Sequence, residues 1–132
     1  MFIASFFGEE NLRELAHVLY KSEMEIYNGI SPIMPPTIDV KTAAMILQKA
    51  GFISPISDFE KIAVEYEEPM KLLYDLKFMG QGNILKQRQR RFFSRKFLNK
   101  ILENYQNLYK NFDNSVNATF EIVTITGWKA KN

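Results

Sequence analysis

Near its C-terminus the sequence reads Val116-Asn-Ala-Thr-Phe-Glu-Ile-Val-Thr-Ile-Thr-Gly-Trp128. This stretch is rich in β-branched and aromatic residues, which predicts a β-strand. Apolar side chains fall on both faces around Phe120, Ile122, Val123 and Ile125. A strand that is apolar on both faces is typical of a position inside a covered sheet, so we expect a central strand here.

Two more stretches predict strands. Phe2 to Phe7 is a short, almost continuous apolar run that ends at Gly8. We interpret it as a strand covered on both faces, as in a parallel sheet, and not as a targeting segment, because it is too short and has no basic leader. Phe59 to Tyr66 alternates between apolar and polar residues, which predicts a strand with one wetter face, near a sheet edge.

Apolar residues at three- and four-residue spacing predict about four helices between these strands. Caps and breakers mark their ends, because Asp and Ser cap helix N-termini, Pro suits the first turn, and Gly stops a helix. The expected helices run from Asn11 to about Ile26, from Asp39 to Gly51, from Pro69 to Gly80, and from Ser94 to Phe112. The predicted class is α/β, with three strands and about four helices in one domain.

Composition narrows the possible functions. A chain of 132 residues has room for one domain and no obvious membrane-spanning segment. It has no cysteine, which excludes a disulfide framework, a thiolate zinc site and an iron–sulfur cluster, and fits the reducing cytoplasm. The net charge of +2 hides an asymmetry, because seven basic and no acidic residues lie between Ile84 and Lys100.

The basic run is the strongest candidate for a binding site. Arginine and lysine side chains can bind carboxylates or phosphates, and several together attract an anionic partner. The candidate residues are Arg88, Arg90, Arg91, Arg95 and Lys96. We expect an acidic protein or substrate here, with a solvated helix start as the equal alternative. Nucleic acid is disfavoured, since the rest of the chain is acidic.

Other chemically suggestive residues have simpler interpretations. His17 has no catalytic partner placed by spacing and is expected to be an ordinary helix residue. Gly80-x-Gly82 follows a helix, so it is expected to be a helix stop and not a phosphate-binding loop. Glu65, Glu67 and Glu68 are interpreted as a solvated strand end. The sequence therefore predicts no catalytic, cofactor-binding or metal-binding residues for this chain on its own.

Several segments together resemble a known family. They are Phe2-Ile-Ala-Ser-Phe-Phe-Gly8, Asn11-Leu-Arg-Glu-Leu15, Ala50-Gly-Phe52, Met79-Gly80 with Asn83, and Val116 to Ile122 with Thr126-Gly-Trp-Lys129. They resemble the C-terminal part of class I S-adenosylmethionine-dependent methyltransferase-like proteins. The subgroup contains the malonyl-carrier-protein methyltransferases and the mitochondrial complex I assembly factor associated with arginine hydroxylation.

This resemblance implies a partial Rossmann-like sheet. The strand at Phe2 to Phe7 would match the fifth strand of the family, and the Phe59 to Tyr66 region the sixth. The stretch from Val116 would be the reversed seventh strand between them. Residues 68–112 would form a helical insertion on the substrate or partner side. The complete family fold implies S-adenosylmethionine as cofactor.

The departures from the family shape the functional hypotheses. The family's glycine-rich turn and acidic cofactor ligand belong to strands that would precede Met1, and Glu9 stands where glycine is common. In the same way, Gln81-Gly82 replaces a typical Glu followed by Ser or Thr. We therefore expect a fragment that is active only with a separate N-terminal half. The alternatives are a degraded gene product and a non-catalytic module docking a carrier protein or respiratory-complex subunit. Homodimerisation through the edge of the first strand is a further expectation.

Overall fold

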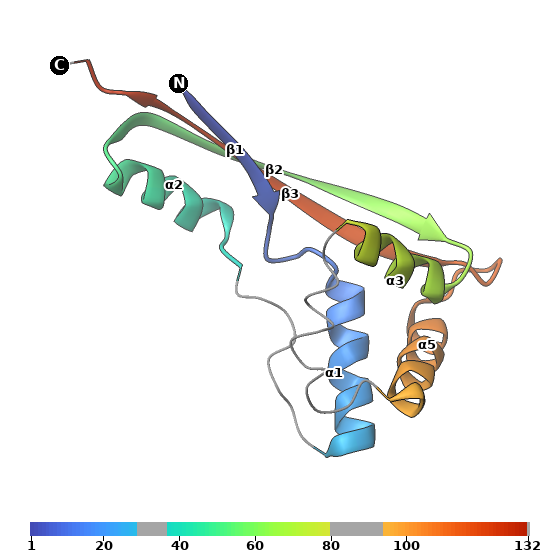
Figure 1. The fold of residues 1–132 in the computed structure, drawn as a ribbon. Coiled ribbons are helices and arrows are strands. Elements are labelled where there is room, and N and C mark those ends of the chain that lie inside the picture. The colour runs from blue at the N-terminus through green and yellow to red at the C-terminus, as the bar shows by residue number, and fades with distance from the viewer. Residues whose placement is uncertain (29–36, 80–93, 132) are drawn as a thin grey trace. The chain divides into compact units, whose positions relative to one another are not determined.

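A computed structural model describes residues 1–28, 37–79 and 94–131 (Figure 1). The order of elements is the expected one. It runs β1 (Phe2–Phe7), α1 (Arg13–Tyr27), α2 (Val40–Lys49), β2 (Phe52–Tyr66), α3 (Pro69–Phe78), α5 (Arg95–Tyr109) and β3 (Val116–Lys129). None of the helices in these ranges is both long and apolar enough to cross a membrane.

The chain divides into two compact units. The first, called the sheet unit, comprises Met1–Asn11, Pro36–Ile62 and Thr119–Asn132. The second, called the helical unit, comprises Leu12–Pro35 and Ala63–Ala118. The sheet unit contains β1, α2 and most of β2 and β3, whereas the helical unit contains α1, α3 and α5.

The three strands form one sheet in the order β1-β3-β2. The last strand in sequence is thus the central one, and it runs antiparallel to its neighbours (Figure 1). Its register with β1 runs from Phe2 opposite Gly127 to Phe7 opposite Ile122. This confirms the predicted central strand and the strand order that the family resemblance implied.

The expected burial of β1 on both faces was wrong for the described chain. Phe2 is 41% exposed and Ile3 is 57% exposed, and Ser5 is also exposed. The reason is position, because β1 lies at an edge of the described sheet and pairs with β3 on one side. A continuous apolar run indicates which side chains of a strand can be buried. Which of them are buried depends on the elements that pack beside the strand.

Strand β2 is longer than the sequence predicted, since it begins at Phe52 and not at Phe59. Pro55 suggested a break, yet it lies within the strand. Proline is tolerated there because β2 is an edge strand, where an N–H group on the outer side needs no partner in the sheet. Just before it, Ser54 adopts a positive φ of 52°, a local irregularity that an alternation pattern does not reveal.

The core of the sheet unit lies between α2 and the sheet. Ala43 and Leu47 of α2 pack with Val123 and Ile125 of β3, and all four are buried. The predicted cap is present, because the Asp39 carboxylate accepts a hydrogen bond of 2.6 Å from the Thr42 amide. The short helix thus has both a fixed start and an apolar face to anchor it.

The helical unit is built around α5, which packs against α1 and α3. Its core contains Leu15 and Val18 of α1, Leu72 of α3 and Ile101 of α5, all fully buried. The Ser94 hydroxyl caps α5 by accepting a bond of 3.1 Å from the Phe97 amide, as predicted.

Helix α5 ends at Tyr109, earlier than the apolar stripe to Phe112 suggested. Lys110 leaves the helical conformation and forms an isolated β-bridge with Val116. The Asn111 amide donates to the Ser115 carbonyl at 2.7 Å, which closes a tight turn. Phe112 is consequently fully exposed and does not belong to the core.

Leu47→Ala should lower the free energy of unfolding by about 2–5 kcal/mol, because it leaves a cavity between α2 and the sheet. Urea unfolding followed by circular dichroism measures the change. Met45→Ala on the same helix is the matched control, since Met45 is 46% exposed, and should cost less than about 0.5 kcal/mol. Equal losses in both variants would contradict the assigned face of α2.

Candidate functional site

The described part of the predicted basic site lies at the start of α5. Arg95 and Lys96 occupy its first turn, and both are exposed. The other three candidates, Arg88, Arg90 and Arg91, lie outside the described residues. An open hollow of about 890 Å³ adjoins this turn, lined by Glu25, Ile26, Arg95, Lys96, Asn99, Lys100 and Glu103.

Of the three basic residues that line this hollow, one forms ion pairs with described acidic residues and two do not. Lys100 Nζ lies 3.0 Å from Glu25 Oε2 and 3.9 Å from Glu103 Oε1. The hydrogen bond from Lys100 holds the pKa of the Glu25 carboxyl below its usual value. By contrast, Arg95 and Lys96 form no ion pair with any residue that the structure describes.

A buried polar contact fixes the helices that carry this hollow. Asn104 of α5 and Ser22 of α1 are both buried, and the Asn104 Nδ2 donates to Ser22 Oγ at 2.9 Å. The same nitrogen lies 3.4 Å from Glu25 Oε2. A buried polar pair must stay matched, because an unpaired group in the interface would lose its hydrogen bond to water. The contact therefore fixes the register of α1 against α5.

A second, smaller hollow of about 380 Å³ lies elsewhere in the helical unit. It is lined by Arg13, Glu14, Tyr109, Asn111 and Asn117. Arg13 Nε is 3.7 Å from Glu14 Oε1, and the Glu14 side chain is largely buried whereas Arg13 is exposed. Its five lining residues include one charge of each sign, those of Arg13 and Glu14.

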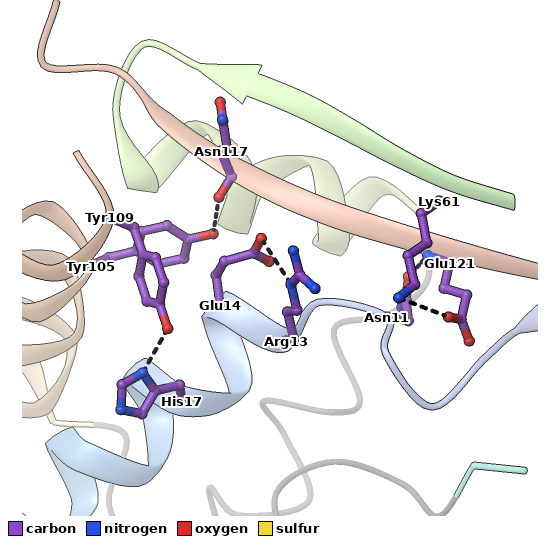
Figure 2. Close-up of polar contacts among 9 residues, drawn as sticks. All are labelled: Asn11, Arg13, Glu14, His17, Lys61, Tyr105, Tyr109, Asn117 and Glu121. Carbon is purple, nitrogen blue, oxygen red and sulfur yellow. Dashed lines mark hydrogen bonds and ion pairs between the residues drawn. The ribbon is translucent and has the colours of Figure 1, made fainter. Parts of the chain in front are cut away.

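Tyr109, which lines this hollow, and the neighbouring Tyr105 both make polar contacts (Figure 2). Tyr105 is buried and donates from its hydroxyl to the Asn117 carbonyl oxygen at 2.8 Å. The Tyr109 hydroxyl is 2.6 Å from His17 Nδ1, and the two tyrosine rings meet edge to face with centroids 5.7 Å apart. His17, expected to be an ordinary helix residue, thus ties α1 to α5.

The environment disfavours ionised phenols in this unit. Burial, followed by the negative charge of Glu14, raises the pKa of Tyr105 well above its usual value. Burial and the hydrogen bond with Asp75 raise the pKa of Tyr66 to about 12. Both phenols therefore stay neutral to a higher pH than an exposed tyrosine does.

The turn that follows β1 holds a third polar group, within the sheet unit. The Gly8 amide donates to the Glu121 carbonyl at 3.0 Å, and the Asn11 Oδ1 accepts from the Glu121 amide at 3.1 Å. Lys61 Nζ lies 4.0 Å from Glu121 Oε2 (Figure 2). Sequence reasoning missed Glu121, although a glutamate between Phe120 and Ile122 of a predicted central strand was the available signal.

The acidic residues at the end of β2 do not converge. Glu65 Oε1 accepts from the Ser115 hydroxyl at 2.7 Å, whereas Glu67 pairs with Lys71 at 2.6 Å. Within the described ranges no group of three histidine, cysteine, aspartate or glutamate residues could hold a metal ion.

Comparison with known proteins gives clear relatives, although no family profile matches the chain. It is 37% identical over 129 residues to the mitochondrial arginine-hydroxylase NDUFAF5 of Dictyostelium discoideum, covering 97% of this chain and 29% of that protein. The human protein of the same name is 33% identical over 98% of this chain and 37% of its own length. A malonyl-[acyl-carrier protein] O-methyltransferase of Gallionella capsiferriformans is 32% identical over 69% of this chain and 31% of its own length.

The chain thus spans about a third of the length of these relatives. The matched region is their C-terminal part. The observed strand order agrees with this placement, since the last strand lies between the other two.

Raised tyrosine pKa values predict alkaline sensitivity. A folded-state pKa above the ordinary 10.0 contributes stability that is complete below about pH 10 and is lost as the pH rises through the folded value. Tyr105→Phe should therefore show a smaller loss of unfolding free energy between about pH 8 and pH 11 than the unchanged chain. Denaturant titrations at both pH values measure this. An equal loss in Tyr105→Phe and in the unchanged chain would refute the explanation.

Proposed function

Since this chain belongs to the methyltransferase-like family of these relatives and corresponds to their C-terminal part, we propose that it acts as one part of a two-part methyltransferase-like protein. The companion would be a separate polypeptide that carries the cofactor-binding strands. The family's methyltransferases imply S-adenosylmethionine as the cofactor of the complete fold. The chain on its own would then bind no cofactor and be inactive.

The exposed edge of β1 carries this proposal. Five of the six residues of β1 (Phe2–Phe7) are apolar, all except Ser5, and the strand lies at an edge of the described sheet. Phe2 and Ile3 are about half exposed. An unpaired strand edge is a ready template for another strand. A three-stranded sheet is also small for an α/β domain, whose sheets average about five or six strands. A companion strand alongside β1 would satisfy both conditions.

Burial supports the same arrangement. Fully burying a phenylalanine or isoleucine side chain stabilises a protein by about 1.5–3 kcal/mol. Phe2 and Ile3 are already partly covered, so further burial would add up to about 1–2 kcal/mol each. Together with the backbone hydrogen bonds of a new strand pair, this is a reasonable driving force for association of two parts of one domain.

The proposal predicts that a complex, and not the separate chain, binds the cofactor. The chain is to be co-expressed with an N-terminal part of a methyltransferase-like relative, ending before its fifth strand. The purified complex should bind S-adenosylmethionine saturably in isothermal titration calorimetry, and the chain alone should not. Mass spectrometry of a treated acceptor would distinguish an added methyl group from an added oxygen atom.

Ile3→Lys is the variant that tests the edge directly, because a charge at an edge strand opposes pairing. It should weaken the complex, whereas Lys129→Ala near the end of β3 should not. Saturable cofactor binding by the chain without a companion would contradict the proposal, as would failure of the two parts to associate.

The unpaired cations at the start of α5 favour a second candidate function, docking of an acidic protein. Arg95 and Lys96 are exposed beside an open hollow, and neither pairs with a described acidic group. Exposed charges of one sign speed the encounter with an oppositely charged partner and weaken with added salt. A carrier protein or an acidic subunit of a respiratory complex is the kind of partner proposed.

The double variant Arg95→Ala with Lys96→Ala should weaken binding of an acyl carrier protein about tenfold at low salt, which corresponds to about 1.4 kcal/mol. Fluorescence anisotropy with a labelled carrier protein measures this. The control removes the same charge from α2 with Lys41→Ala and Lys49→Ala, and should leave binding nearly unchanged. Equal weakening by both double variants would show that the effect depends only on the net charge of the chain. Unchanged binding in the Arg95→Ala, Lys96→Ala variant would exclude the docking site.

A further inference from the structure

We propose that the companion polypeptide also docks on one face of the sheet, which it covers with a helix. This inference rests on the proposed function, and it adds to the edge of β1 a second contact surface that includes the central strand. The two contacts can be tested separately, because a strand that pairs with the edge of β1 does not reach the side chains of β3.

The strand register separates the two faces of the sheet. Residues opposite each other in an antiparallel pair share a face, and neighbours along a strand alternate between faces. Ala4 lies opposite Ile125, and both pack with α2. The same holds for Phe6 and Val123. The residues that alternate with these form the other face, called the open face: Ile3, Ser5, Phe7, Ile122, Thr124 and Thr126.

Burial differs between the two faces of the same central strand. Val123 and Ile125, which face α2, are 0% and 9% exposed. On the open face Thr124 and Thr126 are only half-buried, and Ile3 of the neighbouring strand is 57% exposed. Because β3 has a strand on each side, this contrast depends on what packs on each face. Within the described sheet unit, α2 covers one face and leaves the other accessible.

The composition of the open face is typical of a covered surface. None of its six side chains is charged, whereas a sheet face that meets water usually carries polar and charged residues. The hydroxyls of Ser5 and Thr124 are hydrogen-bonded to each other at 3.0 Å. A covering element can therefore bury this pair while the two hydroxyls keep a partner.

Continuity with the edge of β1 identifies the companion as the occupant. Half of the open face belongs to β1, the strand that is proposed to pair with the companion. The other edge of the sheet, on β2, is protected by Pro55 and by the exposed charges of Asp58 and Glu60. Most of the length of the relatives lies outside the region that this chain matches, so the companion would have enough chain for a further layer.

A helix is the element that suits this position. A companion strand beside β1 extends the sheet sideways and leaves the open face uncovered. In α/β proteins, the connections between parallel strands are usually helices that pack on the faces of the sheet. A domain of this class buries both faces of its sheet in this way.

Cysteine accessibility tests the cover directly, because the chain has no cysteine of its own. Thr126→Cys places a thiol on the open face of the central strand. This thiol should react with a maleimide at least tenfold more slowly in the complex with the N-terminal part of a relative than in the chain alone. Gln48→Cys, at an exposed position of α2, is the matched control and should react at the same rate in both.

Thr126→Lys tests the same surface through affinity. A charge buried under a helix is costly, so this variant should weaken the complex at least tenfold in isothermal titration calorimetry. Gln48→Lys adds the same charge on α2 and should leave the affinity unchanged. The half-buried position of Thr126 should let the Lys variant fold alone, which circular dichroism checks. If it does not fold, the cysteine measurement decides.

The outcomes separate this inference from the proposed function. A complex that protects the β1 amides from hydrogen exchange, but leaves Thr126→Cys as reactive as in the chain alone, would overturn the inference and leave the two-part proposal standing. Equal affinities of Thr126→Lys and Gln48→Lys would also overturn it. Protection of Thr126→Cys in the chain alone, rising with concentration, would assign the open face to a second copy instead. Failure of the two parts to co-purify would contradict both proposals.

Discussion

The antiparallel pairing of β1 with β3 is the constraint on which the rest of the sheet unit depends. It joins the start of the chain to its last strand over six residue pairs, from Phe2 opposite Gly127 to Phe7 opposite Ile122. The pairing places β3 at the centre, with α2 packed against it. It also brings Gly8 and the following turn to Glu121, so the polar group of the sheet unit is a direct consequence of strand register.

The helical unit uses a different means of fixing its parts. Apolar contacts among α1, α3 and α5 form its core, and polar contacts determine how α1 is aligned along α5. Asn104 with Ser22, and Tyr109 with His17, each join α1 to α5 through a side-chain hydrogen bond. The Asn104–Ser22 contact favours one register over its neighbours, because shifting the helices would leave these two buried polar groups unbonded. The hollow lined by Arg95 and Lys96 is formed by residues of these two helices, α1 and α5.

The sequence was informative where one local rule determined the result. Asp39 and Ser94 cap their helices as predicted, and the apolar stretch after Val116 is the central strand. Prediction failed where contacts with other elements of the fold determine the burial or the length of a strand. The edge position of β1 exposes Phe2 and Ile3, and a proline at an edge does not end β2. Glu121 was missed because burial of a charge depends on a turn distant in sequence, and Arg88, Arg90 and Arg91 remain a prediction.

The central claim is that the outer edge of β1 pairs with a strand of a companion. Hydrogen–deuterium exchange of the β1 amides tests it most directly, by comparing the chain alone with the co-expressed complex. In the chain alone, the β1 amides that do not bond to β3 should exchange rapidly; in the complex, these same alternate amides should become strongly protected. A stable complex in which they still exchange as rapidly as in the chain alone would contradict the account.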